Sequence, residues 1–166
     1  MENKLQLFEA TLEKEHTRGL WREVPATIRA SRVGQNRWLN RMCGSGRRFP
    51  SSWEQAVSVV QIDRASERRV LRLRNPGLSR GTTLTLNGCL QILCPGENAP
   101  THRHTAAAIR FIIKGNGAYT VVNGEKITMA EGDLILTPAM TWHDHSSESS
   151  TLVIWFDGLD APLSRF

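Results

Sequence analysis

The chain has 166 residues and a formal net charge of +5, with 40% hydrophobic and 22% charged residues. This length suits one domain with a real core and is tight for two. No apolar run is long enough to span a membrane, and the first residues do not resemble a secretion signal. We therefore expect a cytoplasmic protein with no membrane partner.

The cysteines predict free thiols rather than a disulfide framework. Cys43, Cys89 and Cys94 are odd in number and show no CxxC spacing. Unpaired thiols are typical of a reducing compartment, which agrees with the expected cytoplasmic location.

The positive charge is concentrated in one segment. Residues 22–80 hold 13 arginines against four acids, whereas residues 81–166 have a net charge of −3. One interpretation is a nucleic-acid-binding arm. No stacking aromatic pattern accompanies the arginines, so we favour a solvated segment and expect no nucleic-acid partner.

The first elements in chain order form an N-terminal arm over residues 1–66. A helix is predicted over residues 3–17, because Leu5, Phe8 and Leu12 recur at spacings of three and four. Residues 24–66 are rich in Arg, Ser and Gly and show no sustained period, so no structure is predicted there. We expect the short apolar stripe of the helix to pack against another element or a second subunit.

From residue 67 onwards the sequence predicts a barrel of short strands. The strongest turn signal is Asn123-Gly124, which is typical of a tight hairpin. Turns recur every eight to twelve residues, which indicates an all-β sandwich or barrel over residues 67–166. The expected strands are residues 70–73, 82–93, 107–113, 118–122, 125–129, 134–137 and 151–156.

Three histidines predict a metal site. His102 and His104 are two residues apart, so on a strand both imidazoles would face the same side. His143 follows in the segment Gly132-Asp-Leu-Ile-Leu-Thr-Pro-Ala-Met-Thr-Trp-His143 and would supply a third ligand from a later strand. The opposite side of the ion would remain open for substrate and oxygen.

The spacing of these residues resembles the two sequence motifs of the cupin family. The motifs read Gly96-x5-His102-x-His104 with Gly115-x-Gly117, and Gly132-x5-Pro138-x-Met140-x2-His143. The resemblance implies a jelly-roll-like double-stranded β-barrel that holds a metal. Most cupins add a glutamate ligand after the second histidine, but residues 105–110 contain no carboxylate. A divalent ion on three neutral imidazoles keeps its full charge, which favours an anionic chelating substrate.

Longer runs are similar to the gentisate 1,2-dioxygenases and to salicylate and 1-hydroxy-2-naphthoate ring-cleaving enzymes. They cover residues 102–120, 142–145 and 155–160, within a resemblance that extends over residues 68–164. The resemblance implies Fe(II) as the metal and dioxygen as co-substrate. It also implies ring opening between the carboxyl-bearing and hydroxyl-bearing carbons, with gentisate converted to maleylpyruvate as the best guess. Zinc is the rival ion, because three histidines with an open position also suit it.

The same resemblance assigns roles to three further residues, and a fourth, Gln91, is expected to point inward from its strand. Arg110 would hold the substrate carboxylate, and Asp157 would orient a ligand or a substrate-binding residue. Gln91 would line the substrate cavity, and His145 would act as a catalytic acid, base or hydrogen-bond donor. The structural alternatives are a surface arginine, a turn aspartate and polar residues at the barrel mouth. Asn87 and Cys89 depart from the aromatic and small residues of many relatives, which leaves the exact substrate open.

The length of the chain gives a competing hypothesis. Relatives carry two cupin barrels and associate further, whereas this chain ends at Phe166, just after the second motif of the first barrel. We expect a shortened version whose exposed apolar surface favours a homo-oligomer. The alternative to an enzyme is a non-catalytic metal-binding cupin module, either a relic or a ligand-binding protein.

Overall fold

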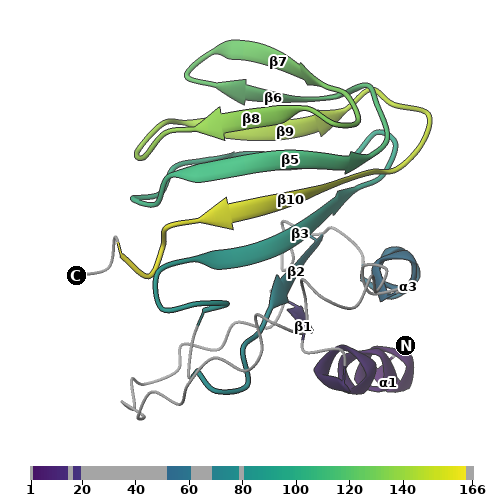
Figure 1. The fold of residues 1–166 in the computed structure, drawn as a ribbon. Coiled ribbons are helices and arrows are strands. Elements are labelled where there is room, and N and C mark those ends of the chain that lie inside the picture. Colours follow the sequence, from purple (N-terminus) through teal and green to yellow (C-terminus); the bar gives the residue numbers. More distant parts are fainter. Residues whose placement is uncertain (1, 15–16, 20–51, 61–68, 79–80, 164–166) are drawn as a thin grey trace.

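A computed structural model describes residues 2–14, 17–19, 52–60, 69–78 and 81–163. Within these residues the fold is two antiparallel β-sheets with two short helices, which confirms the all-β prediction (Figure 1). Most of the arginine-rich segment lies outside the described residues. No described helix has both the length and the apolar character needed to cross a membrane.

The larger sheet has six strands and forms one wall of the barrel. Its spatial order is β1 (Thr17–Gly19), β2 (Arg69–Leu73), β3 (Asn87–Leu93), β10 (Val153–Leu159), β5 (Ala108–Lys114) and β8 (Leu134–Thr137). The last strand of the barrel, β10, therefore lies between β3 and β5, which are far from it in sequence.

The smaller sheet has four strands and forms the opposite wall. Its order is β4 (Asn98–His102), β9 (His143–Ser147), β6 (Ala118–Val122) and β7 (Glu125–Met129). The hairpin of β6 and β7 turns at Asn123-Gly124, where both residues have positive φ. Asn and Gly tolerate this backbone region, so the predicted hairpin is confirmed with the bounds expected for both strands.

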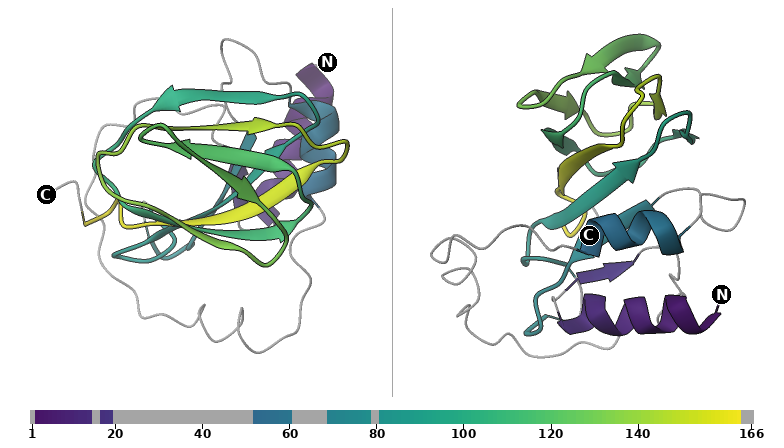
Figure 2. Two further views of the ribbon diagram at one scale, coloured as in Figure 1. Left: turned by 90° about the horizontal axis from the view of Figure 1, so that it is seen from above. Right: turned by 90° about the vertical axis from the view of Figure 1, so that its right-hand side faces the viewer.

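The helices α1 (Glu2–Lys14) and α3 (Ser52–Val59) cover the outer face of β2 and β3. Figure 2 (right) shows them at the end of the larger sheet, away from β6 and β7. The predicted apolar stripe of α1 packs here: Phe8 and Leu12 join a buried cluster with Ala56, Val60, Leu71, Leu90, Ile92 and Ile154.

Two sequence predictions of local structure were wrong. The helix predicted over residues 3–17 ends at Lys14, and Thr17 instead begins β1, which pairs with β2. The strand predicted from Thr82 begins only at Asn87. Before it, the Thr83 hydroxyl accepts hydrogen bonds from the backbone N–H groups of Thr85 and Leu86. Such local side-chain bonds compete with strand pairing.

Strict alternation on the larger sheet separates two surfaces. Arg110 and Ile112 of β5 are buried inside the barrel, whereas Ile109 and Phe111 are about half exposed outside. At one end the interior is apolar, with a core of Leu93, Ile112, Ala118, Met129, Ile135, Val153 and Trp155. At the other end the inward residues are polar, and this is where the sequence predicted a site.

Candidate active site

The three predicted metal ligands come together at the polar end of the barrel. One ring nitrogen from each of His102, His104 and His143 lies within 4.8 Å of the others, so the set could hold one metal ion. The ring centroids of His102 and His143 are 4.1 Å apart, as expected for directly paired residues of β4 and β9. His104 lies in the loop beyond β4 rather than on a strand, yet its ring reaches the same point.

Backbone carbonyls fix the orientation of all three imidazoles. Nδ1 of His102 lies 3.2 Å from the His143 carbonyl oxygen, and Nδ1 of His143 lies 3.0 Å from that of Thr141. Nδ1 of His104 lies 2.7 Å from the Ala106 carbonyl oxygen. Because a carbonyl only accepts, each neutral ring carries its proton on Nδ1 and its lone pair on Nε2. This is the arrangement expected around a histidine-bound metal.

The loops that carry the ligands are tied together by backbone contacts. Met140, which has a positive φ of 62°, donates its N–H to the His104 carbonyl at 2.9 Å. The hairpin residue Asn123 donates its N–H to the Trp142 carbonyl and accepts the Trp142 N–H with its side chain. The turn between β6 and β7 therefore positions the residue just before His143.

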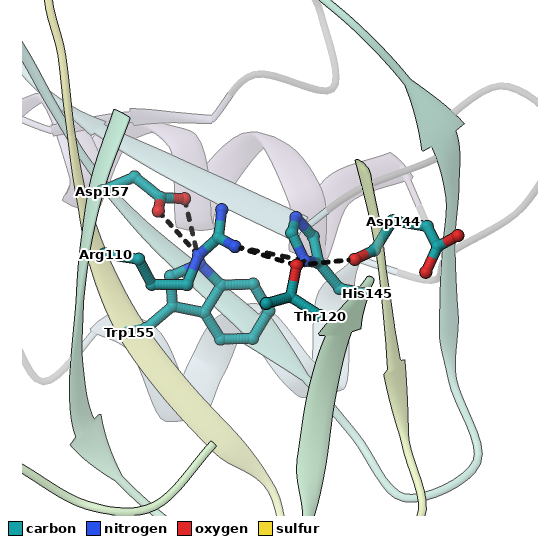
Figure 3. Close-up of polar contacts among 6 residues, drawn as sticks. All are labelled: Arg110, Thr120, Asp144, His145, Trp155 and Asp157. Atoms are coloured by element: carbon teal, nitrogen blue, oxygen red, sulfur yellow. Dashed lines mark hydrogen bonds and ion pairs between the residues drawn. The ribbon is translucent and has the colours of Figure 1, made fainter. Parts of the chain in front are cut away.

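The larger sheet supplies the facing wall of a cavity of about 250 Å³. Arg110 and Asp157 lie directly opposite each other on β5 and β10, and the Arg110 Nε donates to Asp157 Oδ1 at 2.9 Å. Asp157 Oδ2 accepts the indole N–H of Trp155 at 2.9 Å, and the Arg110 guanidinium lies 5.4 Å from that ring (Figure 3). Both charged side chains are buried, so the pair is a fixed part of the cavity.

Arg110 reaches across the cavity to the opposite sheet. Its Nη1 lies 3.3 Å from both the Thr120 hydroxyl and Nδ1 of His145, as Figure 3 shows. Thr120 and His145 are paired on β6 and β9, with 3.0 Å between the hydroxyl and Nδ1. Thr120 also donates to the Asp144 carbonyl at 2.9 Å. As expected, His145 faces inward like His143, whereas the Asp144 side chain accepts the Thr101 hydroxyl away from the cavity.

Gln91 lies where the sequence placed it, on the cavity wall. It is 4% exposed, and among the described residues its Nε2 has no hydrogen-bond partner. A buried donor without a partner costs about 1–3 kcal/mol. Asn87 and Cys89 line the same wall on alternate positions of β3.

A second ion pair, between a buried arginine and a partly exposed glutamate, lies at a distance from this cavity. Arg69 donates from both terminal nitrogens to the Glu97 carboxylate at 2.9 and 3.0 Å, and from Nε to the Val60 carbonyl. Burial raises the pKa of Glu97, but hydrogen bonds from Arg69 and the Cys94 N–H and attraction to Arg69 outweigh it and lower the pKa. Burial and the nearby Glu97 raise the pKa of the Cys94 thiol. Of the described cysteines, Cys89 and Cys94 form no disulfide, as predicted, and Cys43 lies outside the described residues.

Sequence reasoning missed Thr120, which contacts Arg110 and His145, and Arg72, which lines the cavity. Thr120 occupies an inward position two residues after Ala118 on a strand whose bounds were predicted, so strand alternation would have shown that it faces inward. Arg72 is a charged residue on an otherwise apolar strand and lines the cavity from β2. A charged residue in that pattern was the available signal.

Comparisons with known proteins agree with this geometry. Residues 89–158 match the cupin domain family. The chain is 52% identical over 125 residues to a gentisate 1,2-dioxygenase of Aquipseudomonas alcaligenes, covering 69% of this chain and 36% of that protein. It is 36% identical over 171 residues to a 1-hydroxy-2-naphthoate 1,2-dioxygenase of a Nocardioides species, covering 96% of this chain and 42% of that protein.

A solved structure gives the same relationship in three dimensions. The salicylate 1,2-dioxygenase of Pseudaminobacter salicylatoxidans superposes with a TM-score of 0.63 at 33% identity, covering 97% of this chain and 45% of that one. The chain thus spans less than half the length of each of these three relatives. It is a cupin protein related to the gentisate and salicylate 1,2-dioxygenases.

Proposed function

We propose that this protein binds Fe(II) through His102, His104 and His143 and uses it to cleave the ring of a hydroxylated aromatic acid with dioxygen, gentisate being the best candidate. The observation that carries the proposal is the set of three Nδ1–carbonyl contacts. They hold three neutral nitrogen donors toward one point beside a cavity that already contains a guanidinium. The similarity to ring-cleaving dioxygenases supports this reading.

The residues present fit a ferrous ion and a chelating anion. Imidazole nitrogen suits iron, and three neutral ligands leave the charge of the ion uncompensated. When bound, Fe(II) supplies the positive charge that matches a carboxylate with an adjacent phenolate, together with the electrons for dioxygen chemistry.

The larger sheet would hold and orient the substrate. Among the described residues, Arg110 Nη2 has no partner, because Asp157, Thr120 and His145 engage only Nε and Nη1. A guanidinium nitrogen in this position suits a carboxylate oxygen, and Gln91 lines the same cavity. Asp157 fixes the guanidinium plane, so we assign it a positioning role.

His145 would serve as a hydrogen-bond donor to the substrate or to oxygen. Its Nδ1 lies 3.0 Å from the Thr120 hydroxyl and 3.3 Å from Arg110 Nη1, and these contacts orient the ring. Since His145 lines the cavity beside His143, its imidazole would lie next to a bound substrate. We propose this group as the one that moves or shares a proton during ring opening.

Anaerobic loading followed by oxygen tests the proposal. The protein is loaded with Fe(II) or, as the control for the rival ion, with Zn(II), then mixed with gentisate before oxygen is admitted. We expect oxygen uptake and a new ring-opened product only with iron. Iron bound at one per chain without turnover would contradict ring cleavage and leave a metal-binding cupin module.

We also propose self-association through the outer face of β10, β5 and β8. In register across these strands, Phe156 lies beside Phe111 and Phe111 beside Leu134, while Ile109 lies beside Leu136. The last four are 45–62% exposed. Two copies related by a two-fold axis would bury this apolar face against itself.

Sedimentation velocity tests this self-association. The wild type should sediment as a dimer, and Leu136→Lys should dissociate it. Leu7→Lys, on the exposed side of α1, is the control and should leave the dimer intact. A monomeric wild type would contradict the proposal.

A further inference from the structure

One peptide unit joins the imidazole of His104 to a carboxylate outside the cavity. Nδ1 of His104 lies 2.7 Å from the Ala106 carbonyl oxygen, and the N–H of Ala107 donates to Asp160 Oδ1 at 2.7 Å. The carbonyl of Ala106 and the N–H of Ala107 belong to the same planar amide group. The contacts therefore run from the imidazole through this amide to the Asp160 carboxylate.

His104 depends on such support more than the other two predicted ligands do. His102 and His143 lie on the paired strands β4 and β9, whereas His104 lies in the loop of residues 103–107. Individual contacts rather than strand pairing therefore determine where its imidazole lies. One is the bond from the Met140 N–H to the His104 carbonyl at 2.9 Å, and others come from the residues that follow β10.

Asp160 is itself fixed by backbone bonds. Its N–H donates back to the Ala107 carbonyl at 3.2 Å, and its carbonyl accepts the Leu163 N–H at 2.8 Å, which closes a turn after β10. Asp160 is not among the described residues that line the cavity. It would therefore act on the metal ligand from outside, without contact to a substrate.

The same construction recurs at a second ligand. Nδ1 of His143 lies 3.0 Å from the Thr141 carbonyl oxygen, and the N–H of the same amide group, that of Trp142, donates to Asn123 Oδ1 at 3.0 Å. Here the final acceptor is a neutral amide, whereas at His104 it is a carboxylate. In both places a side-chain acceptor orients the amide that in turn orients the imidazole.

A carboxylate in this position has two effects on the imidazole of His104. It fixes the plane of the amide, so the carbonyl oxygen stays directed at Nδ1. It also polarises the amide, because hydrogen bonds in a chain strengthen one another. A stronger acceptor at Nδ1 makes the other ring nitrogen a better metal ligand. Both effects slow the release of a bound ion.

We propose that Asp160 is a positioning residue for the metal ligand His104 and that it lowers the rate at which the site releases a divalent ion. This inference rests on the proposed function for metal binding by the three histidines, but it does not depend on ring cleavage.

The rate of iron release measures this role without any turnover. Protein loaded anaerobically with Fe(II) is mixed with excess bipyridine, and the coloured ferrous complex reports the release. Asp160→Ala removes the acceptor, so iron should leave about tenfold faster than from the wild type, the lower end of the effect of losing a group that supports a ligand. Asp160→Asn keeps a weaker, neutral acceptor, and release should be about threefold faster.

Asp133 offers a matched control in another turn. Its Oδ2 accepts the Ala130 N–H at 2.8 Å, and its own N–H donates to the Ala130 carbonyl at 3.0 Å. Asp133→Ala therefore removes the same contact and the same charge, in a turn between β7 and β8 that holds none of the three histidines. Asp133→Ala and Asp133→Asn should release iron at the wild-type rate. Urea unfolding of the metal-free proteins shows which variants are folded.

The outcomes separate this inference from ring cleavage. Release from Asp160→Ala within about twofold of the wild type, equal release from the two Asp160 variants, or equal acceleration in Asp133→Ala would overturn the positioning role. If Asp160→Ala does not fold, equal rates in Asp160→Asn and Asp133→Asn would overturn it. The expected order of rates, without oxygen uptake in the presence of gentisate, would uphold the role of Asp160 and contradict ring cleavage. A wild type that binds no iron would contradict both.

Discussion

The two walls of the cavity are built on different physical principles. On the smaller sheet, backbone carbonyls hold neutral imidazoles, so the metal ligands depend on the course of β4 and β9 and on the loops beyond them. On the larger sheet, side chains hold charged side chains, as in the pair of Arg110 and Asp157. We therefore expect metal binding and substrate binding to be separable. Substitutions on the smaller sheet should alter metal content, and substitutions on the larger sheet should alter ligand affinity.

The largest effect is expected from a break in the metal wall. His104→Ala removes one of three nitrogen donors, so bound iron should fall to near zero and any ring cleavage at least about 100-fold. Metal analysis after anaerobic dialysis provides the measurement. His145→Gln is the matched control on the same wall, since His145 lies outside the three-histidine cluster and its replacement should leave iron bound. Undiminished iron in His104→Ala would refute the three-histidine site.

A change on the substrate wall should show the opposite pattern. Arg110→Lys keeps the positive charge but loses the planar guanidinium, whose nitrogens contact Asp157 on one side and Thr120 of the smaller sheet on the other. We expect salicylate affinity to fall about 10- to 100-fold, the value of a lost hydrogen bond to a charged group, while iron remains at one per chain. Titration of the iron-loaded variant without oxygen measures both quantities. If iron were lost in parallel with affinity, the two walls would not be separable.

The contact between the walls gives a smaller effect. Thr120→Val removes a buried hydroxyl that joins Arg110 and His145 to the Asp144 carbonyl. We expect kcat to fall about tenfold with little change in KM or in iron content. The imidazole of His145 is retained, but the hydroxyl that orients it is lost. Thr120→Ser should restore the rate, since it returns the hydroxyl. A rate loss in valine and serine variants alike would indicate packing instead of positioning.

The smallest effect on activity is expected far from both walls, at the Arg69–Glu97 pair. The folded-state pKa of Glu97 is lowered. Its contribution to stability is therefore full above the ordinary glutamate pKa of about 4.3 and is lost as pH falls through the lower folded value. Glu97→Gln should cost about 1–3 kcal/mol of stability at pH 7 and weaken the acid dependence of urea unfolding below about pH 4.3. An acid dependence equal to that of the wild type would show that Glu97 is not its source.

The sequence predicted the metal wall better than the substrate wall, for physical reasons. Histidine spacing and strand alternation are local signals, so the inward positions of His102, His143 and His145 could be inferred from the sequence alone. Alternation within β2 and β6 could have shown that Arg72 and Thr120 face inward. Their cross-strand partners, Cys89 and His145, follow from pairing between distant strands, which a single strand pattern does not specify. The bounds of the β6–β7 hairpin followed from one turn of two residues.

The local errors have the same origin. Residues 15–17 continue a helical composition, but Thr17 pairs with Leu73 of β2, so a long-range contact decides its structure. Thr82 to Leu86 have strand-forming side chains, yet the hydroxyls of Thr82 and Thr83 bond to nearby backbone groups and close a loop. Neither outcome follows from the intrinsic preferences of the residues involved.

X-ray absorption spectroscopy of the Fe(II)-loaded protein tests most directly whether His102, His104 and His143 bind one iron ion together. We predict a nitrogen shell with scattering from three imidazole rings, reduced to two rings in any His102, His104 or His143 variant that still retains some iron. A shell with fewer than three imidazoles in the wild type, or one dominated by carboxylate oxygen or thiolate sulfur, would contradict the site.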